Sequence, residues 1–183
     1  MARKLPRFLT EAEIVAVLAA AEGQERDQML MKTMYFLGLR NSEAQKLLIE
    51  DIDPINRVIK VVQSKRDKDR MVPIPPGFVP ELREFIGDRR EGPLFPGRDG
   101  KGQLSDRHIR RIVKDYAVKA GVRKPDEVHP HTLRHSYATH LQDQGVPLNV
   151  IQQLLGHSRV ETTTIYLHLG IGRMKEWIDK AFG

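Results

Sequence analysis

Apolar residues recur at helical spacing along most of the chain. The first run, Ile14, Val17 and Leu18, follows Thr10 and Glu13, whose separation is typical of a capping box at a helix N-terminus. Ser42 and Gln45 form a second such pair, which predicts a short helix beginning right after Arg40. The same spacing predicts further helices at 27–37, 79–88, 106–120, 131–144, 147–155 and 172–182.

Two short runs have the composition of β-strands instead. Residues 57–62 and 70–74 are rich in β-branched side chains, and the polar turn 64–68 between them predicts a hairpin. We expect residues 49–52 to add a third strand. The fold class is therefore mainly α with a small antiparallel three-stranded sheet (α+β). Neither an internal repeat nor a linker interrupts the pattern, so we expect residues 1–183 to form a single domain.

Composition excludes several classes of protein. The 183 residues are 40% hydrophobic and 30% charged, which is typical of a globular protein with a core. Apolar runs are too short to cross a bilayer, and the basic N-terminus lacks the apolar stretch of a signal peptide. We therefore expect a cytoplasmic protein without a membrane partner. Cysteine is absent, which excludes disulfides and thiolate metal sites.

Positive charge is concentrated in one segment. The net charge is +6, and residues 101–124 hold eight basic residues against two acidic ones. In the predicted helix at 106–120 the apolar positions occupy one face and the arginines and lysines the other. Such a face suits an anionic partner, of which nucleic acid is the commonest.

Six polar residues beside apolar runs carry candidate chemistry. They are two guanidiniums, one ammonium, two imidazoles and a phenol: Arg40, Lys65, His131, Arg134, His157 and Tyr166. Arginines can stabilise the negative charge of a phosphodiester transition state, and imidazole can activate a phenol nucleophile. An ammonium can protonate the leaving oxygen. The set therefore predicts phosphoryl transfer without a metal or cofactor.

The order Arg, Lys, His-x-x-Arg, His, Tyr resembles that of the tyrosine recombinase (lambda-integrase) family, and looks closest to its Xer-type members. The matching stretches are Gly38 to Glu43 (GLRNSE), Lys65 to Pro73 (KRDKDRMVP), Pro130 to Leu141 (PHTLRHSYATHL) and Leu154 to Tyr166 (LLGHSRVETTTIY). The resemblance as a whole extends over nearly the entire chain. The resemblance implies the catalytic-domain fold of that family.

It also implies a reaction. Tyr166 would attack the scissile phosphate to give a 3′-phosphotyrosine, and Lys65 would protonate the departing 5′-oxygen. Attack by the 5′-hydroxyl of another strand would reverse the step. The function expected is thus that of a site-specific DNA recombinase or integrase.

The remaining site residues would support that step. By the same resemblance Arg40 and Arg134 would hold the non-bridging oxygens, His131 would assist proton movement and His157 would hydrogen-bond the phosphate. Glu43 would support the site from behind. Further DNA contacts are expected from one set of basic residues: Arg70, Arg107, Arg110, Arg111 and Lys114.

Members of that family act on double-stranded DNA as tetramers that join two duplexes, so the resemblance implies a homo- or hetero-tetramer. Most members also carry an N-terminal helical domain that completes a clamp around DNA. This chain opens near the usual start of the catalytic domain, so we expect the N-terminal domain to be absent. The segment 172–183 is expected to dock on a neighbouring protomer or on its own domain.

Three alternatives stay open. The chain could be a non-catalytic DNA-binding relative, or it could nick and reseal DNA as a type IB topoisomerase does, with the same chemistry. A metallohydrolase built on four histidines is a third: His129, His131, His135 and His140. No carboxylate lies between His131 and His135, and Arg134 would add a cation beside such a metal.

Overall fold

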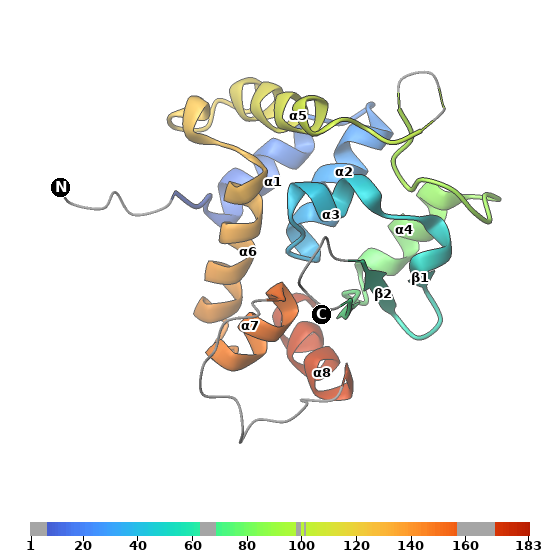
Figure 1. Cartoon of the computed structure of the whole chain (residues 1–183). Helices are drawn as coiled ribbons and strands as arrows, with labels where there is room; N and C mark the ends of the chain where they lie inside the picture. The colour runs from blue at the N-terminus through green and yellow to red at the C-terminus, as the bar shows by residue number, and fades with distance from the viewer. Residues whose placement is uncertain (1–6, 63–68, 98–99, 101, 157–170) are drawn as a thin grey trace. The chain divides into compact units, whose positions relative to one another are not determined.

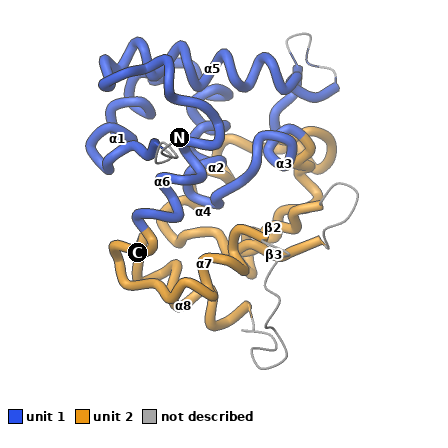
Figure 2. The backbone as a smooth tube through the Cα atoms, turned by 60° about the vertical axis from the view of Figure 1, so that its left-hand side comes forward, with its two compact units in different colours: residues 1–45, 95–140 blue, residues 46–94, 141–183 orange. Residues whose placement is uncertain are grey.

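The chain was analysed as a computed structural model, which describes residues 7–62, 69–97, 100, 102–156 and 171–183 (Figure 1). Three of the predicted site residues, Lys65, His157 and Tyr166, lie outside these ranges. Two compact units share the chain (Figure 2): unit 1 holds residues 1–45 and 95–140, and unit 2 holds residues 46–94 and 141–183. Because each unit combines distant segments, each depends on long-range packing rather than on local structure alone.

Unit 1 is helical. It contains α1 (Glu11–Ala19), α2 (Glu25–Phe36), most of α3 (Asn41–Lys46), α5 (Asp106–Lys119) and α6 (Pro130–Asp143) through His140. Helix α1 packs against both α2 and α5. Apolar side chains of this unit form a fully buried core: Leu30, Met34, Leu39, Ile109, Val113, Leu133 and Tyr137.

Side-chain caps fix where two of these helices begin. Thr10 accepts the backbone N–H of Glu13, whose carboxylate accepts the N–H of Thr10, completing the predicted capping box of α1. Ser105 caps α5 by accepting the N–H of His108. Since α5 buries Ile109, Ile112, Val113 and Ala117, its arginines and lysines are left on the opposite face.

Unit 2 combines the sheet with three helices. Strands β1 (Ile52–Asp53), β2 (Val58–Val61) and β3 (Arg70–Pro73) are antiparallel in the order β1-β2-β3. Helices α4 (Phe78–Ile86), α7 (Leu148–Leu155) and α8 (Ile171–Phe182) complete it. Helix α8 packs on β3 and buries Ile178 fully. This helix therefore contacts the sheet of its own unit.

An ion pair adds to the packing of α8. Both guanidinium nitrogens Nη1 and Nη2 of Arg57, at the start of the hairpin, donate to the Asp179 carboxylate on α8, at 2.7 and 2.9 Å. The pair is half-exposed, so bidentate geometry rather than burial gives it strength. It fastens the C-terminal helix to the hairpin of the same unit.

The predicted fold class is confirmed, with two local differences. Helix α3 begins at Asn41, so Ser42 lies inside its first turn, and the carboxylate of Glu43 accepts the backbone N–H of Arg40 instead. Residues 49–51 form a 3₁₀ turn, so the third strand is only Ile52–Asp53. No helix in the described part of the chain is long and apolar enough to span a membrane.

Candidate active site

A glycine turn places the first site residue. Helix α2 ends at Phe36, and Gly38 follows its cap residue with a φ of +59° that is readily adopted only by glycine. The N–H of Leu39 donates to the Met34 carbonyl at 3.1 Å. Leu39 is then fully buried. This reversal brings Arg40 to the position just before α3, where its carbonyl accepts the N–H groups of Glu43 and Ala44.

Glu43 connects Arg40 to the core. Its carboxylate is 5% exposed; Oε2 accepts the backbone N–H of Arg40 at 2.8 Å, and Oε1 accepts from Nη1 of the same arginine at 3.1 Å. A buried carboxylate is stable only when it is paired and hydrogen-bonded. Both conditions are met here.

Arg134 reaches the same carboxylate from α6. Its side chain is 8% exposed, Nη1 donates to the Gly38 carbonyl at 2.7 Å, and that nitrogen lies 3.7 Å from Glu43 Oε2. We call Arg40, Glu43 and Arg134 the arginine cluster. Two guanidiniums and one carboxylate leave a surplus of one positive charge. A phosphodiester bound there would neutralise that surplus, and its transition state would be stabilised further.

His131 lies three residues before Arg134 in the first turn of α6. Its pKa is lowered from the ordinary value of 6.5, first because neighbouring atoms partly desolvate the ring. The positive charges of Arg134, Arg110 and Arg40 lower it further, and Asp106 opposes them. The imidazole is therefore neutral at pH 7, the form that can accept a proton.

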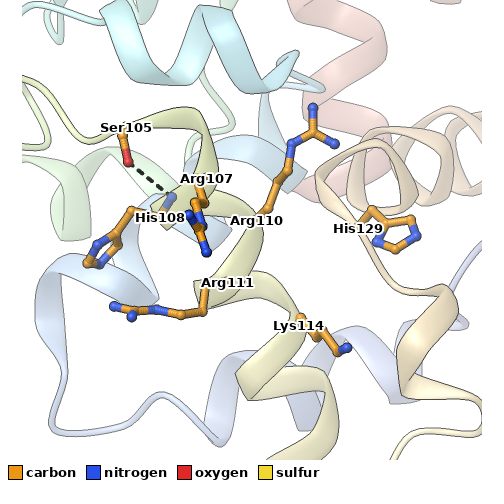
Figure 3. A pocket seen from close by; sticks show the side chains of 7 residues that line it. All are labelled: Ser105, Arg107, His108, Arg110, Arg111, Lys114 and His129. Carbon is orange, nitrogen blue, oxygen red and sulfur yellow. Dashed lines mark hydrogen bonds between the residues drawn. The ribbon is translucent and has the colours of Figure 1, made fainter.

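A second feature of unit 1 is a basic pocket on α5. It encloses about 650 Å³ and is lined by seven residues: Ser105, Arg107, His108, Arg110, Arg111, Lys114 and His129. Figure 3 shows that all but Ser105 and His129, which precede α5 and α6, project from α5, and that Arg110 and Arg111 point in different directions. Such a hollow lined by four cations suits phosphate groups.

Two acidic residues already pair with this pocket. Asp106 Oδ2 accepts from Arg110 Nε at 2.6 Å, and Asp126 Oδ1 lies 2.9 Å from Lys114 Nζ. The pairs raise the pKa of both bases and lower that of Asp106, in each case chiefly through the hydrogen bond. All four side chains are at least half exposed, so an incoming phosphate can compete for the cations.

The structure thus brings together part of the predicted site. Arg40, Glu43, His131 and Arg134 share unit 1, and the four predicted DNA-binding residues of α5 line one pocket. Arg70 is elsewhere: in unit 2 its Nε donates to the Leu154 carbonyl at the end of α7, at 2.9 Å.

Three residues of the pocket are not among the predicted DNA contacts: Ser105, His108 and His129. Ser105 and His108 could have been found, because they lie at the start of the helix that carries the arginines. His129 could not, because it reaches the pocket from a separate segment.

The four-histidine alternative gains no support from the described residues. Among them no three His, Asp or Glu side chains are grouped as metal ligands would be. His140 is instead buried, with Nδ1 hydrogen-bonded to the Tyr35 hydroxyl at 2.7 Å. Burial, with a smaller contribution from Glu11, raises the pKa of Tyr35 well above its ordinary value, so the phenol stays protonated.

Comparison with known proteins agrees with this geometry. The model of the phage integrase family matches residues 7–171. A tyrosine recombinase of Thermosipho africanus (strain TCF52B) is 40% identical over 169 residues, which are 91% of this chain and 59% of that protein. The solved structure of XerA recombinase superposes with a TM-score of 0.77 at 32% identity, covering 96% of this chain and 65% of that one.

A third relative was solved with DNA. XerH site-specific recombinase, in a pre-cleavage complex with its difH substrate, superposes with a TM-score of 0.73 at 28% identity, over 95% of this chain and 54% of that one. The chain spans less than two thirds of the length of these three proteins. Its fold is that of tyrosine recombinase catalytic domains, and the chain belongs to the phage integrase family.

Proposed function

We propose that this chain is the catalytic domain of a site-specific DNA recombinase that cleaves and rejoins DNA through a 3′-phosphotyrosine. The observation that carries the proposal is the arginine cluster: Arg40 and Arg134 come from different segments and meet at the buried Glu43. His131 lies beside them with a lowered pKa. An ordinary surface arginine would not be held by a buried carboxylate and a main-chain carbonyl.

In the proposed reaction Arg40 and Arg134 bind the two non-bridging oxygens of the scissile phosphate. Each guanidinium has several N–H donors, so it can contact an intramolecular acceptor and a phosphate oxygen together. Because Glu43 and the Gly38 carbonyl hold these groups before DNA arrives, little reorganisation accompanies the reaction.

The covalent step follows from the family resemblance. The Tyr166 oxygen attacks phosphorus, the bond to the 5′-oxygen breaks, and that oxygen takes a proton from Lys65. Neutral His131 receives or relays the phenol proton, and His157 donates a hydrogen bond to the phosphate. The reverse attack by a 5′-hydroxyl restores the phosphodiester bond, so its energy is retained and no metal or nucleotide cofactor is needed.

The basic pocket of α5 is proposed to bind the DNA backbone. Arg107, Arg110, Arg111 and Lys114 supply positive charge on one exposed helix face, and the XerH relative was solved on a DNA substrate. Arg70 is proposed as a weaker contributor because its Nε is engaged at α7. Strand exchange would involve a tetramer on two duplexes, which separates a recombinase from an enzyme that only nicks and reseals.

A suicide substrate tests the chemistry. DNA nicked next to the cleavage position releases a short oligonucleotide after attack and traps the covalent adduct. We expect an adduct in the presence of EDTA, visible as a shift on a denaturing gel, and its complete loss in Tyr166→Phe. An adduct that persists in this variant, or that needs a divalent metal, would refute the mechanism.

The test requires a DNA site that the enzyme recognises. A library of random duplexes with a nick, selected by covalent capture on the protein, supplies such a site directly. Tyr116→Phe is the matched control, because this tyrosine on α5 loses the same hydroxyl outside the arginine cluster. It should form the adduct as the unmodified chain does.

A further inference from the structure

Asp106 connects the basic pocket of α5 with Asn41, the neighbour of Arg40 in the arginine cluster. It is the first residue of α5, next to the capping Ser105, and its carboxylate accepts from Arg110 Nε of the basic pocket. Its Oδ1 atom also accepts a hydrogen bond from Nδ2 of Asn41, the first residue of α3. One half-exposed carboxylate therefore contacts both the helix with the basic pocket and the helix that begins beside Arg40.

Asn41 is an unusual partner. Its side chain is 5% exposed, and its buried Oδ1 atom has no hydrogen-bond partner among the described residues. An unsatisfied buried acceptor is costly, so the amide gains most of its stabilisation from the Nδ2 side. The reverse orientation of the amide would place Oδ1 against the Asp106 carboxylate, which would be repulsive. Asn41 is thus held in place chiefly by Asp106, and it adjoins Arg40 directly in the chain.

We propose that Asp106 is a positioning residue that couples DNA binding by α5 to the placement of Arg40. The proposal rests on the proposed function. Asp106 belongs to α5, so its hydrogen bond to Asn41 transmits the position of the DNA-bound α5 to the first turn of α3, also when a phosphate replaces the carboxylate at Arg110. In the proposed reaction Arg40 holds the phosphate correctly only while this connection is intact.

The electrostatics of His131 support the same arrangement. Burial of the ring and the charge of Arg134 lower the pKa of this residue most, Arg110 of α5 and Arg40 before α3 lower it further, and Asp106 partly opposes them. These charges act on one ring only because all of them lie near the start of α6. Asp106 supplies the negative charge among them, so it also balances the arginines around the candidate proton acceptor.

Asp126 provides a matched control. It forms the same kind of exposed pair with Lys114 of the basic pocket, and it lies on a different segment from the one that contacts α3. Asp106→Ala and Asp126→Ala each remove one negative charge beside a DNA-binding cation, and Asp106→Ala also removes the side-chain acceptor of the Asn41 hydrogen bond. Both variants should therefore bind DNA at least as tightly as the unmodified chain, as measured by fluorescence anisotropy at fixed salt.

The two variants should differ in cleavage. On saturating suicide substrate we expect Asp106→Ala to form the covalent adduct about tenfold more slowly, and Asp126→Ala to cleave at the normal rate. Equal cleavage rates for the two variants would overturn the proposal. If the unmodified chain itself formed no Tyr166-dependent adduct, the proposed function would fail instead, so the two failures are distinguishable.

A second variant removes the donor of the Asn41–Asp106 hydrogen bond. Asn41→Ala breaks the hydrogen bond to Asp106 without changing the charge of the DNA-facing surface. It should slow cleavage to a similar degree, and the double variant should be no slower than either single one, because both remove the same link. Losses that multiply in the double variant would show independent roles and overturn the proposal. Thermal unfolding checks that each variant is folded at the assay temperature.

Discussion

Two arginines of unit 1 carry the same guanidinium group but differ in burial and in their hydrogen-bond partners. Arg134 is 8% exposed and is held by a main-chain carbonyl and the buried Glu43, whereas Arg110 is 55% exposed and pairs with the half-exposed Asp106. The first is fixed before any ligand arrives. The second can exchange its carboxylate for a phosphate at little cost. An arginine side chain is therefore suited to preorganised chemistry when it is buried and to adaptable binding when it is exposed.

The largest effect should come from Arg134→Lys. The Arg134 guanidinium donates to the Gly38 carbonyl and, in the proposed reaction, also to the incoming phosphate. A single ammonium group cannot reproduce that planar geometry. We expect adduct formation to slow about a thousandfold on saturating DNA, with DNA affinity nearly unchanged. The matched control is Arg111→Lys in the basic pocket, where charge alone should suffice. Similar rate losses in both variants would abolish the distinction between buried and exposed arginines.

Glu43→Gln tests the buried side of the comparison through stability. It removes the counter-charge of two arginines, one of them almost fully buried, and should lower the free energy of unfolding by about 3 kcal/mol. Denaturant titration followed by circular dichroism measures the change. Asp126→Asn, which breaks an exposed ion pair, should leave the denaturant concentration at the midpoint of unfolding unchanged. A stable Glu43→Gln protein would mean that Arg134 finds compensation elsewhere.

The salt dependence of DNA binding tests the role of the exposed cations in the basic pocket. Replacing Arg111 or Lys114 with alanine should weaken DNA binding about tenfold at low salt and reduce the slope of log affinity against log salt by roughly 0.9. The cleavage rate at saturation should stay the same, because neither residue belongs to the arginine cluster. A cleavage rate that falls while the DNA is saturating would place these residues in the chemical step.

The pKa of His131 depends on charges of both the arginine cluster and the basic pocket. Because its pKa is lowered, the neutral ring should persist below pH 6.5, and its ring resonances in an NMR titration should move only at more acidic pH. Arg110→Ala removes one of the positive charges that depress this pKa, so the midpoint should rise. Asp106→Asn removes the opposing charge, so the midpoint should fall. Shifts in the opposite directions would contradict the arrangement of charges around the ring.

The smallest effect concerns the half-exposed pair of unit 2. Asp179→Asn should lower the free energy of unfolding by less than about 1 kcal/mol, because both side chains are partly solvated. Ile178→Ala on the same helix should cost several times more, since it leaves a cavity under α8. Chemical unfolding of the two variants side by side measures the ratio. A larger loss from Asp179→Asn would show that the ion pair, rather than packing, holds α8.

Local patterns in the sequence predict most of the fold. The capping box at Thr10 is a short-range signal, and the structure confirms it. The short helix does begin right after Arg40 as predicted, but Ser42 does not cap it, and Glu43 accepts the backbone N–H of Arg40.

Long-range contacts explain what the sequence could not supply. Asn41 and Asp106 are 65 residues apart, and nothing in the spacing of either residue indicates that they meet. Arg70 was expected to face DNA, and its Nε is bound to the Leu154 carbonyl, which lies 84 residues further along the chain. Such pairings depend on how elements pack, whereas caps and turns depend on neighbours.

The Gly38 carbonyl has a consequence for how the site can evolve. A main-chain acceptor cannot be deleted by any replacement of a side chain, so the anchor of Arg134 is robust to mutation. Its position nevertheless depends on a backbone conformation that almost any other residue would disfavour. The surrounding sequence can therefore drift, including the residues that choose a DNA site, while one glycine keeps the reacting geometry in place.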